Sequence, residues 1–360
     1  MAIELHHPEL IKLRPIYRKL SRLYGLASLL HWDQETHLPV AGMKERAETL
    51  ADIYSLINET LTGEELYKQL TGLVDIRTLE VRDQSLSSVE KRFVVQCARQ
   101  YHFSTCVDSD FIIRYEKQRV FAQASWTRAR REDRFELFAE DLERNIAFAR
   151  EYARKINPDR SAYDVLLDMH MEGVTSKWLD QIFAELAIEL KKIMTEWNHQ
   201  HRAETPVSPP LFPENRIESF CQMLIAKLGL GPDTAILSQS THPFCAPIHP
   251  TDIRLTNRYD DPSYLNAIAG AIHEFGHGLH AHQAADDWLG SPLGFCFDPA
   301  ICESQSRFWE IMIGKDQNFL TWLHTQLSGH LGAEAPSFAD FIRESKTISI
   351  GLIRVNEGEV

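Results

Sequence analysis

Two histidines four positions apart are the residues of this chain best suited to carry out chemistry. The segment His273-Glu274-Phe275-Gly276-His277 reads H-E-x-x-H. On a helix, residues i and i+4 lie on one face about one turn apart, so both imidazoles can bind one zinc ion at about 2 Å. A glutamate beside the ion can take a proton from a water molecule. The spacing predicts a catalytic zinc site, with His273 and His277 as ligands and Glu274 as the general base.

A catalytic zinc ion also needs a third protein ligand and one open position. The longer pattern H-E-x-x-H-x-x-G-x-x-H fails, because His280 stands where it requires glycine and Gln283 where it requires histidine. Nearby histidines remain candidates, but a carboxylate from a later helix is the better one. The acidic residues within reach are Asp286, Asp287, Asp298, Glu303 and Glu310. Glu303 and Glu310 lie seven residues apart on one amphipathic stretch, and spacing alone does not choose between them.

The elements that position these residues are predicted to be mainly helices. Apolar residues at helical spacing on both sides of the motif predict that the zinc helix is buried. A second stripe predicts a helix over residues 176–197, with Thr175 or Ser176 as its N-cap. Its apolar members are Trp178, Ile182, Phe183, Leu186, Leu190 and Ile193.

One stretch, residues 252–259, alternates apolar and polar residues and therefore predicts a β-strand. Arg254, Thr256 and Arg258 would share one face of it. Three prolines precede the stretch, which favours a short hairpin or an edge element. Four prolines within residues 205–215 mark a loop or linker. We therefore expect an N-terminal helical region, 1–204, and a metal-site region, 205–360.

Composition excludes several classes of protein. The 360 residues are 44% hydrophobic and 25% charged, as in an ordinary globular protein, and the net charge of -13 argues against a nucleic-acid partner. No apolar run is long enough for a membrane helix, and no signal peptide is evident. The six cysteines form no C-x-x-C pair, so we expect reduced thiols and a cytoplasmic protein.

An ordered set of motifs resembles the thermostable, Taq-type metallocarboxypeptidases of peptidase family M32. The resemblance covers essentially the whole chain, and the ordered set is far more specific than H-E-x-x-H alone. The motifs are Trp32-Asp33-Gln34-Glu35, Tyr163 to Asp168, His242-Pro243-Phe244 (H-P-F), Asp252, Arg254 and Thr256 (D-x-R-x-T), the H-E-x-x-H segment, Gly290 to Gly294 (G-T/S-P-L-G) and Glu303 to Arg307 (E-S-Q-S-R).

This resemblance implies a large, mainly helical, zincin-like fold with a deep cleft and a small β-sheet beside the H-E-x-x-H helix. It implies that Glu303 is the third ligand, with zinc or cobalt as the metal, and that the protein forms a homodimer. It further implies removal of single residues from the C-terminus of peptides.

The chain departs from the family pattern at two places. Cys302 stands where the family has a histidine beside a metal ligand, which bears on the tuning of that ligand. Glu357-Gly358 replace the Ala-Asp of the family's I-R-x-x-A-D motif, and the chain then ends at Val360, where family members continue. The resemblance therefore predicts that the C-terminal part of the family fold is missing.

A carboxypeptidase must also bind the free carboxylate of its substrate, a task that suits a planar guanidinium. Arg254 and Arg354 are the candidates, and His242 is a candidate for contacts with the substrate backbone or the oxyanion. Two other functions remain open. One is a truncated, catalytically impaired metal-binding remnant of the family, and the other is an H-E-x-x-H endo-oligopeptidase.

Overall fold

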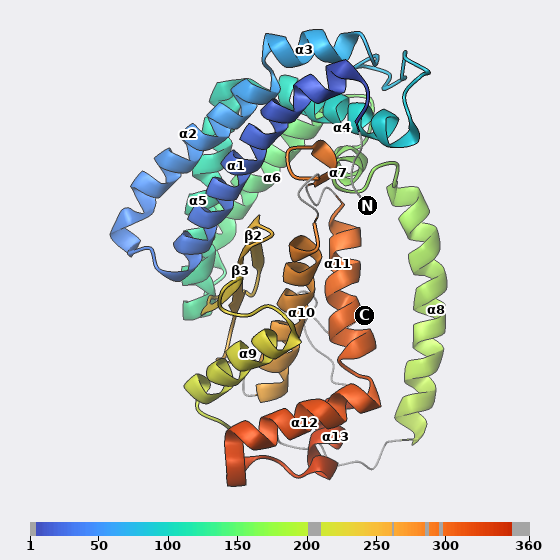
Figure 1. Ribbon diagram of the computed structural model, residues 1–360. Helices are drawn as coiled ribbons and strands as arrows, with labels where there is room; N and C mark the ends of the chain where they lie inside the picture. The colour runs from blue at the N-terminus through green and yellow to red at the C-terminus, as the bar shows by residue number, and fades with distance from the viewer. Residues whose placement is uncertain (1–4, 201–209, 261–262, 285–287, 295–297, 348–360) are drawn as a thin grey trace.

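The computed structural model describes residues 5–200, 210–260, 263–284, 288–294 and 298–347 (Figure 1). The described chain is mainly helical, as predicted. The elements of its first half are α1 (Pro8–Thr36), η1 (Val40–Gly42), α2 (Met43–Leu61), α3 (Glu64–Thr71), α4 (Ser88–Thr105), α5 (Ser109–Glu132), α6 (Glu136–Ile156), α7 (Ala162–His170) and α8 (Ser176–Gln200).

The second half contains the small sheet and the zinc-motif helix. Its elements are α9 (Glu214–Leu228), β1 (Ala235–Gln239), β2 (Cys245–His249), β3 (Asp252–Asn257), α10 (Tyr264–His282), η2 (Pro292–Gly294), α11 (Pro299–Arg307), the π-helical turn η3 (Phe308–Ile313), α12 (Gln317–Leu331), η4 (Gly332–Glu334) and α13 (Phe338–Ser345). No helix in this described part is long and apolar enough to cross a membrane.

The predicted strand lies in the centre of the sheet rather than at its edge. The strand order is β1-β3-β2, with β3 parallel to β1 and antiparallel to β2. Of the two predicted alternatives, the hairpin is confirmed, because β2 and β3 are antiparallel and only Pro250 and Thr251 connect them. The edge position was wrong because none of the prolines lies in β3. Pro247 lies in the edge strand β2 and Pro250 in the turn after it, so neither removes a hydrogen bond from β3.

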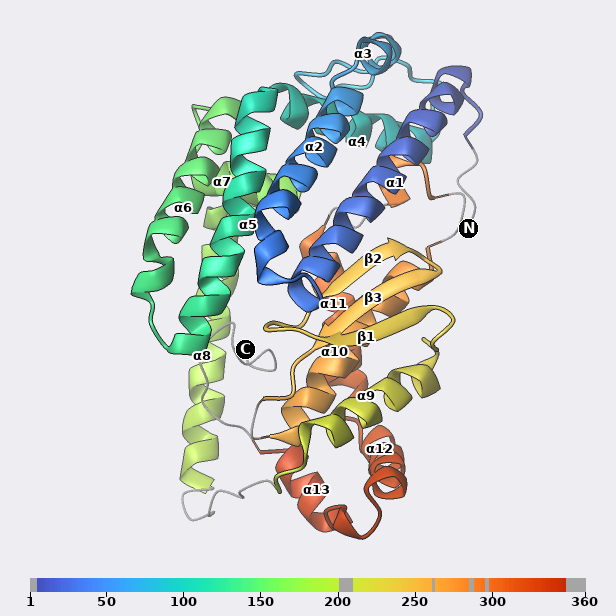
Figure 2. The ribbon, with the colours of Figure 1, turned by 90° about the vertical axis from the view of Figure 1, so that its left-hand side faces the viewer.

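The sheet lies between α1 and α10 (Figure 2). Ile253 and Leu255 of β3 point into one hydrophobic core, which α9, α10, α12 and α13 complete. A second core lies among α1, α2, α3 and α4, and Leu293 of η2 packs against it. The two layers meet at the sheet, so the metal-motif helix is held at a set distance from the N-terminal helices. The boundary between residues 204 and 205 stays a prediction.

Helix α8 is present where the sequence predicted it, and Thr175 caps it by accepting a hydrogen bond from Trp178 N. Its apolar stripe, however, is not buried by the described residues. The exposed fractions of Trp178, Phe183 and Ile193 are 49%, 57% and 60%. Figure 1 shows α8 running alone beyond its junction with α7.

The buried carboxylate of Glu90 on α4 binds the backbone just before α1. Glu90 completes a capping box with Ser87 and also accepts the backbone N–H groups of His6 and His7 at 2.8 and 2.9 Å. Burial alone would raise the pKa of Glu90, but these backbone donors lower it to about 2. A carboxyl group whose pKa is lower in the folded than in the unfolded protein stabilises the fold at pH values above its unfolded pKa. This stabilisation is lost as the pH falls towards the folded pKa.

We predict that Glu90→Gln destabilises the protein by about 1–3 kcal/mol at pH 7, since either orientation of the amide places a donor against backbone N–H groups. Urea unfolding at pH 7 and pH 3 measures this, and the difference from the native protein should shrink at pH 3. Glu65→Gln on α3, an exposed position, is the control. An equal difference at both pH values would contradict this role of the charge.

Candidate metal centre

The H-E-x-x-H motif lies in the middle of α10, where the helix is covered on several sides. His273 and Glu274 are 5% and 2% exposed, and Phe275 is fully buried. The ring of Phe275 packs edge-on against Trp309 of η3, with centroids 4.9 Å apart. This apolar packing orients α10, so that His273 and His277 face α11.

Three potential ligand atoms converge at this point, from His273, His277 and Glu303, and all lie within 4.8 Å of one another. Glu303 Oε2 lies 3.4 Å from His273 Nε2 and 3.6 Å from His277 Nε2. Ligand atoms about 2 Å from a tetrahedral ion are about 3.3 Å apart. The observed spacing and the two-nitrogen, one-oxygen donor set therefore fit a divalent metal such as zinc.

Helix α11 reaches the two histidines because α10 has a glycine at the crossing. A Cβ atom at Gly276 would lie 2.7 Å from Ser306 Cα and 3.0 Å from Gln305 O. Ser306 in turn donates its hydroxyl to Glu303 Oε2 at 3.0 Å. The residue that α10 touches thus also orients the carboxylate that faces its histidines.

Glu310, the other carboxylate that the sequence left open, lies on the opposite side of His273. Its Oε2 is 2.8 Å from His273 Nδ1, whereas Glu303 faces Nε2 of the same ring. The seven-residue spacing did place both glutamates towards α10, but only Glu303 joins both histidines. Asp298 instead caps α11, and Asp286 and Asp287 lie outside the described residues.

The electrostatics of the three groups favour a positive charge between them. The hydrogen bond with His273 is the main reason that the pKa of Glu303 falls to about 2. Burial would lower the pKa of His273, but Glu303 and Glu310 raise it to about 10. Burial, and then His273, lowers the pKa of His277 to about 4. A divalent cation that takes the place of the His273 proton would supply this positive charge.

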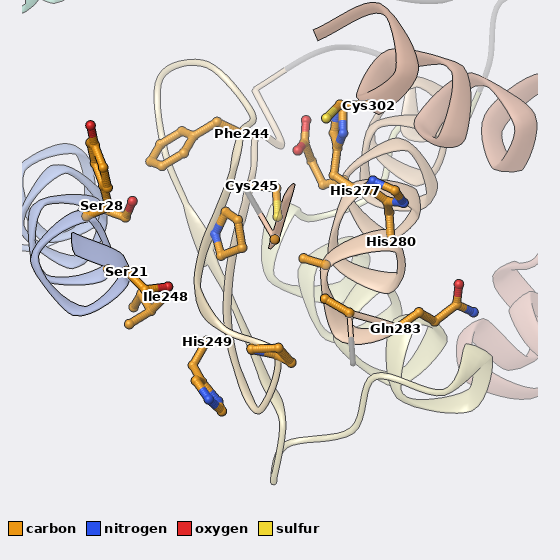
Figure 3. A pocket seen from close by; sticks show the side chains of 18 of the residues that line it. Ser21, Ser28, Phe244, Cys245, Ile248, His249, His277, His280, Gln283 and Cys302 are labelled. Atoms are coloured by element: carbon orange, nitrogen blue, oxygen red, sulfur yellow. The ribbon is translucent and has the colours of Figure 1, made fainter. Parts of the chain in front are cut away.

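A cavity of about 1020 Å³ opens beside these residues, and Glu274 lines it together with them. Ser21 and Ser28 of α1 form one side, His277 and His280 of α10 the other, and β2 lies between (Figure 3). Among its described lining residues there is no arginine or lysine, and histidines supply the basic groups.

The predicted substrate-binding residues have different surroundings. His242 lines the cavity. Arg254 does not line it, because its guanidinium pairs with Asp252 at 2.6 Å and stacks on Trp32, with 5.1 Å to the ring centroid. Arg354 lies outside the described residues.

Two other sequence candidates are also placed. His280 lines the cavity without joining the ligand group, and His282 Nδ1 lies 2.6 Å from Pro250 O.

Cys302 lines the cavity too and is disulfide-bonded. The expectation of reduced thiols is therefore wrong for Cys302, because a local motif search tests only C-x-x-C spacing.

Sequence reasoning missed the contribution of α1 to the cavity, because residues about 250 positions from the motif carry no local sign of the contact. It also missed Ser306 as the donor to Glu303. The serine of E-S-Q-S at position i+3 from the carboxylate was the available signal.

Comparison with known proteins identifies the family of this chain. Residues 12–360 match the model of the family described as carboxypeptidase Taq (M32) metallopeptidase. The chain belongs to this family. Carboxypeptidase 1 of Bacillus subtilis is 28% identical over 354 residues, which are 96% of this chain and 68% of the relative. Thermostable carboxypeptidase 1 of Pyrococcus furiosus is 26% identical over 342 residues, 94% of this chain and 66% of the relative.

A solved structure titled Trypanosoma cruzi metallocarboxypeptidase 1 superposes with a TM-score of 0.80 at 24% identity, covering 97% of this chain and 70% of that one. This likeness confirms the helical fold. The predicted family is confirmed as well, and with it the class of enzyme, a metallopeptidase that hydrolyses peptide bonds. The M32 chain spans about two thirds of the length of these relatives.

We predict that Gly276→Ala weakens metal binding and destabilises the M32 chain by about 1–3 kcal/mol, because α10 and α11 must separate. Gly329→Ala on α12 is the matched control: nothing lies within 4 Å of the added Cβ, and alanine favours a helix by about 0.5–1 kcal/mol. Thermal unfolding and Co²⁺ titration measure both effects. Native-like metal affinity in Gly276→Ala would show that the close crossing is not needed.

Proposed function

We propose that this M32 chain is a zinc-dependent metallocarboxypeptidase that releases single amino acids from the C-terminus of peptides. The observation that carries the proposal is the convergence of His273, His277 and Glu303 on the wall of a large cavity. Small-molecule pockets measure about 300–1,000 Å³, so this cavity has room for the end of a peptide chain.

In this proposal His273, His277 and Glu303 hold the ion, and Glu274 moves the proton. A divalent ion supplies Lewis-acid chemistry, because it lowers the pKa of a water molecule and polarises a carbonyl group. The Glu274 carboxylate accepts the proton of the attacking water and delivers it to the leaving amine. Its position next to His273 on a buried helix, and on the cavity wall, supports this role.

Recognition of the substrate carboxylate is assigned to Arg254, Arg354 and His242. His242 has the strongest support, since it lines the cavity. For Arg254 to bind substrate directly, its guanidinium must leave Asp252 and the face of Trp32. In its described position it is suited to holding β3 against α1.

The remaining proposals rest mainly on the family resemblance. Zinc is the proposed metal, with cobalt as a substitute, because two imidazoles and one carboxylate form a donor set typical of catalytic zinc. We also propose a homodimer in the cytoplasm.

We predict that the zinc-loaded protein shortens a free-acid peptide stepwise from its C-terminus and leaves the C-terminally amidated twin intact. The reason is that a carboxypeptidase needs the terminal carboxylate as a binding group. Mass spectrometry of the products measures the outcome, with chelator-treated protein as the control. Cleavage of both peptides would identify an endo-oligopeptidase, and cleavage of neither with metal bound would identify a metal-binding remnant.

We predict that Glu274→Gln lowers turnover roughly 10²–10⁴-fold, the range typical of a lost general base, while metal affinity changes little. Glutamine keeps the size of the side chain but cannot accept the proton. Glu185→Gln on the exposed surface of α8 is the control and should cleave at the native rate. Retained turnover in Glu274→Gln would remove Glu274 from its assigned role.

A further inference from the structure

We propose that Glu310 is the positioning residue of the metal centre, which holds the ring of His273 so that Nε2 is presented to the ion. The inference deepens the proposed function and rests on its metal site. Within that site it separates the roles of two carboxylates, Glu303 and Glu310, between which residue spacing alone does not choose.

The ring of His273 is held from both sides. Glu310 Oε2 lies 2.8 Å from Nδ1, and Glu303 Oε2 lies 3.4 Å from Nε2. Because a carboxylate only accepts hydrogen bonds, its contact with Nδ1 requires the proton on that nitrogen. The lone pair of the neutral ring is then on Nε2, the atom that faces Glu303 and His277.

The contact is buried, which makes it strong and directional. Glu310 and His273 are each 5% exposed. A carboxylate at such a position is costly unless it is paired, and Arg307 pairs with it: Nη1 donates to Glu310 Oε2 at 3.0 Å.

The backbone places Glu310 through the π-helical turn η3, which continues α11 from residue 308 to 313. Single π-turns are rare and occur often at functional sites. Glu303 on α11 and Glu310 on η3 thus reach the two nitrogens of one imidazole from a single helical segment. A partner on the non-coordinating nitrogen of a metal-binding histidine fixes its tautomer and orientation, and its loss typically weakens metal affinity 10–100-fold.

The experiment compares Co²⁺ affinity of the full chain and three variants, by calorimetry and by the visible absorption of the bound ion. Glu310→Ala should weaken binding about 10–100-fold. Glu310→Gln, whose amide oxygen can still accept from Nδ1, should weaken it less. Glu344→Gln is the matched control, because Glu344 accepts a 2.8 Å hydrogen bond from Tyr264 on the same helix α10 but lies away from the ligands.

Unfolding of the metal-free variants separates positioning from support of the fold. A merely structural Glu310 would lower the melting temperature while the folded fraction kept native Co²⁺ affinity, and that result would overturn the proposal. If Glu310→Ala does not fold, Glu310→Gln decides, and native Co²⁺ affinity in that variant overturns the proposal equally.

The measurement is independent of peptide cleavage. Weakened Co²⁺ binding in the Glu310 variants of a chain that cleaves no peptide would support the positioning role while the proposed function failed. A native protein that binds no Co²⁺ would overturn both.

Discussion

The proposed metal centre depends on the close crossing of α10 and α11 at Gly276. The α10 backbone approaches Ser306 so closely that a methyl group would not fit between the helices. Ser306 also donates to Glu303, which faces both histidines. Helix packing and ligand geometry are therefore one constraint, since any change in the distance between α10 and α11 moves the carboxylate relative to the two imidazoles.

The opposite side of α10 is subject to a second close approach. A Cβ atom at Gly278 would meet Leu230, Ile253 and Leu255 at 2.9–3.2 Å, so α10 lies tightly against the sheet. The sheet lies against α1. The width of the cavity is thus set by a continuous stack of α1, sheet, α10 and α11, and each layer must be in place before the ligands and the cavity wall face one another.

Charges in this stack are arranged in pairs, which offsets the cost of removing the buried members, such as His273 and Glu310, from water. His273 lies between Glu303 and Glu310, and Glu310 also accepts from Arg307. The Arg254 guanidinium is similarly enclosed by Asp252 and Trp32 where the sheet meets α1. The carboxylates around His273 can also hold a metal cation. The contacts of Arg254 involve only residues of this chain, and they connect the sheet to α1.

The sequence by itself determined the features that depend on neighbouring residues. Helical periodicity placed His273, Glu274 and His277 on one turn, and apolar periodicity predicted α8 and the burial of α10, because these patterns repeat within a few residues. Tertiary structure decided which of Glu303 and Glu310 meets both histidines, that β3 is a central strand, that α1 lines the cavity, and that the stripe of α8 stays exposed. These outcomes depend on contacts between segments distant in the chain, and residue spacing contains no information about such contacts.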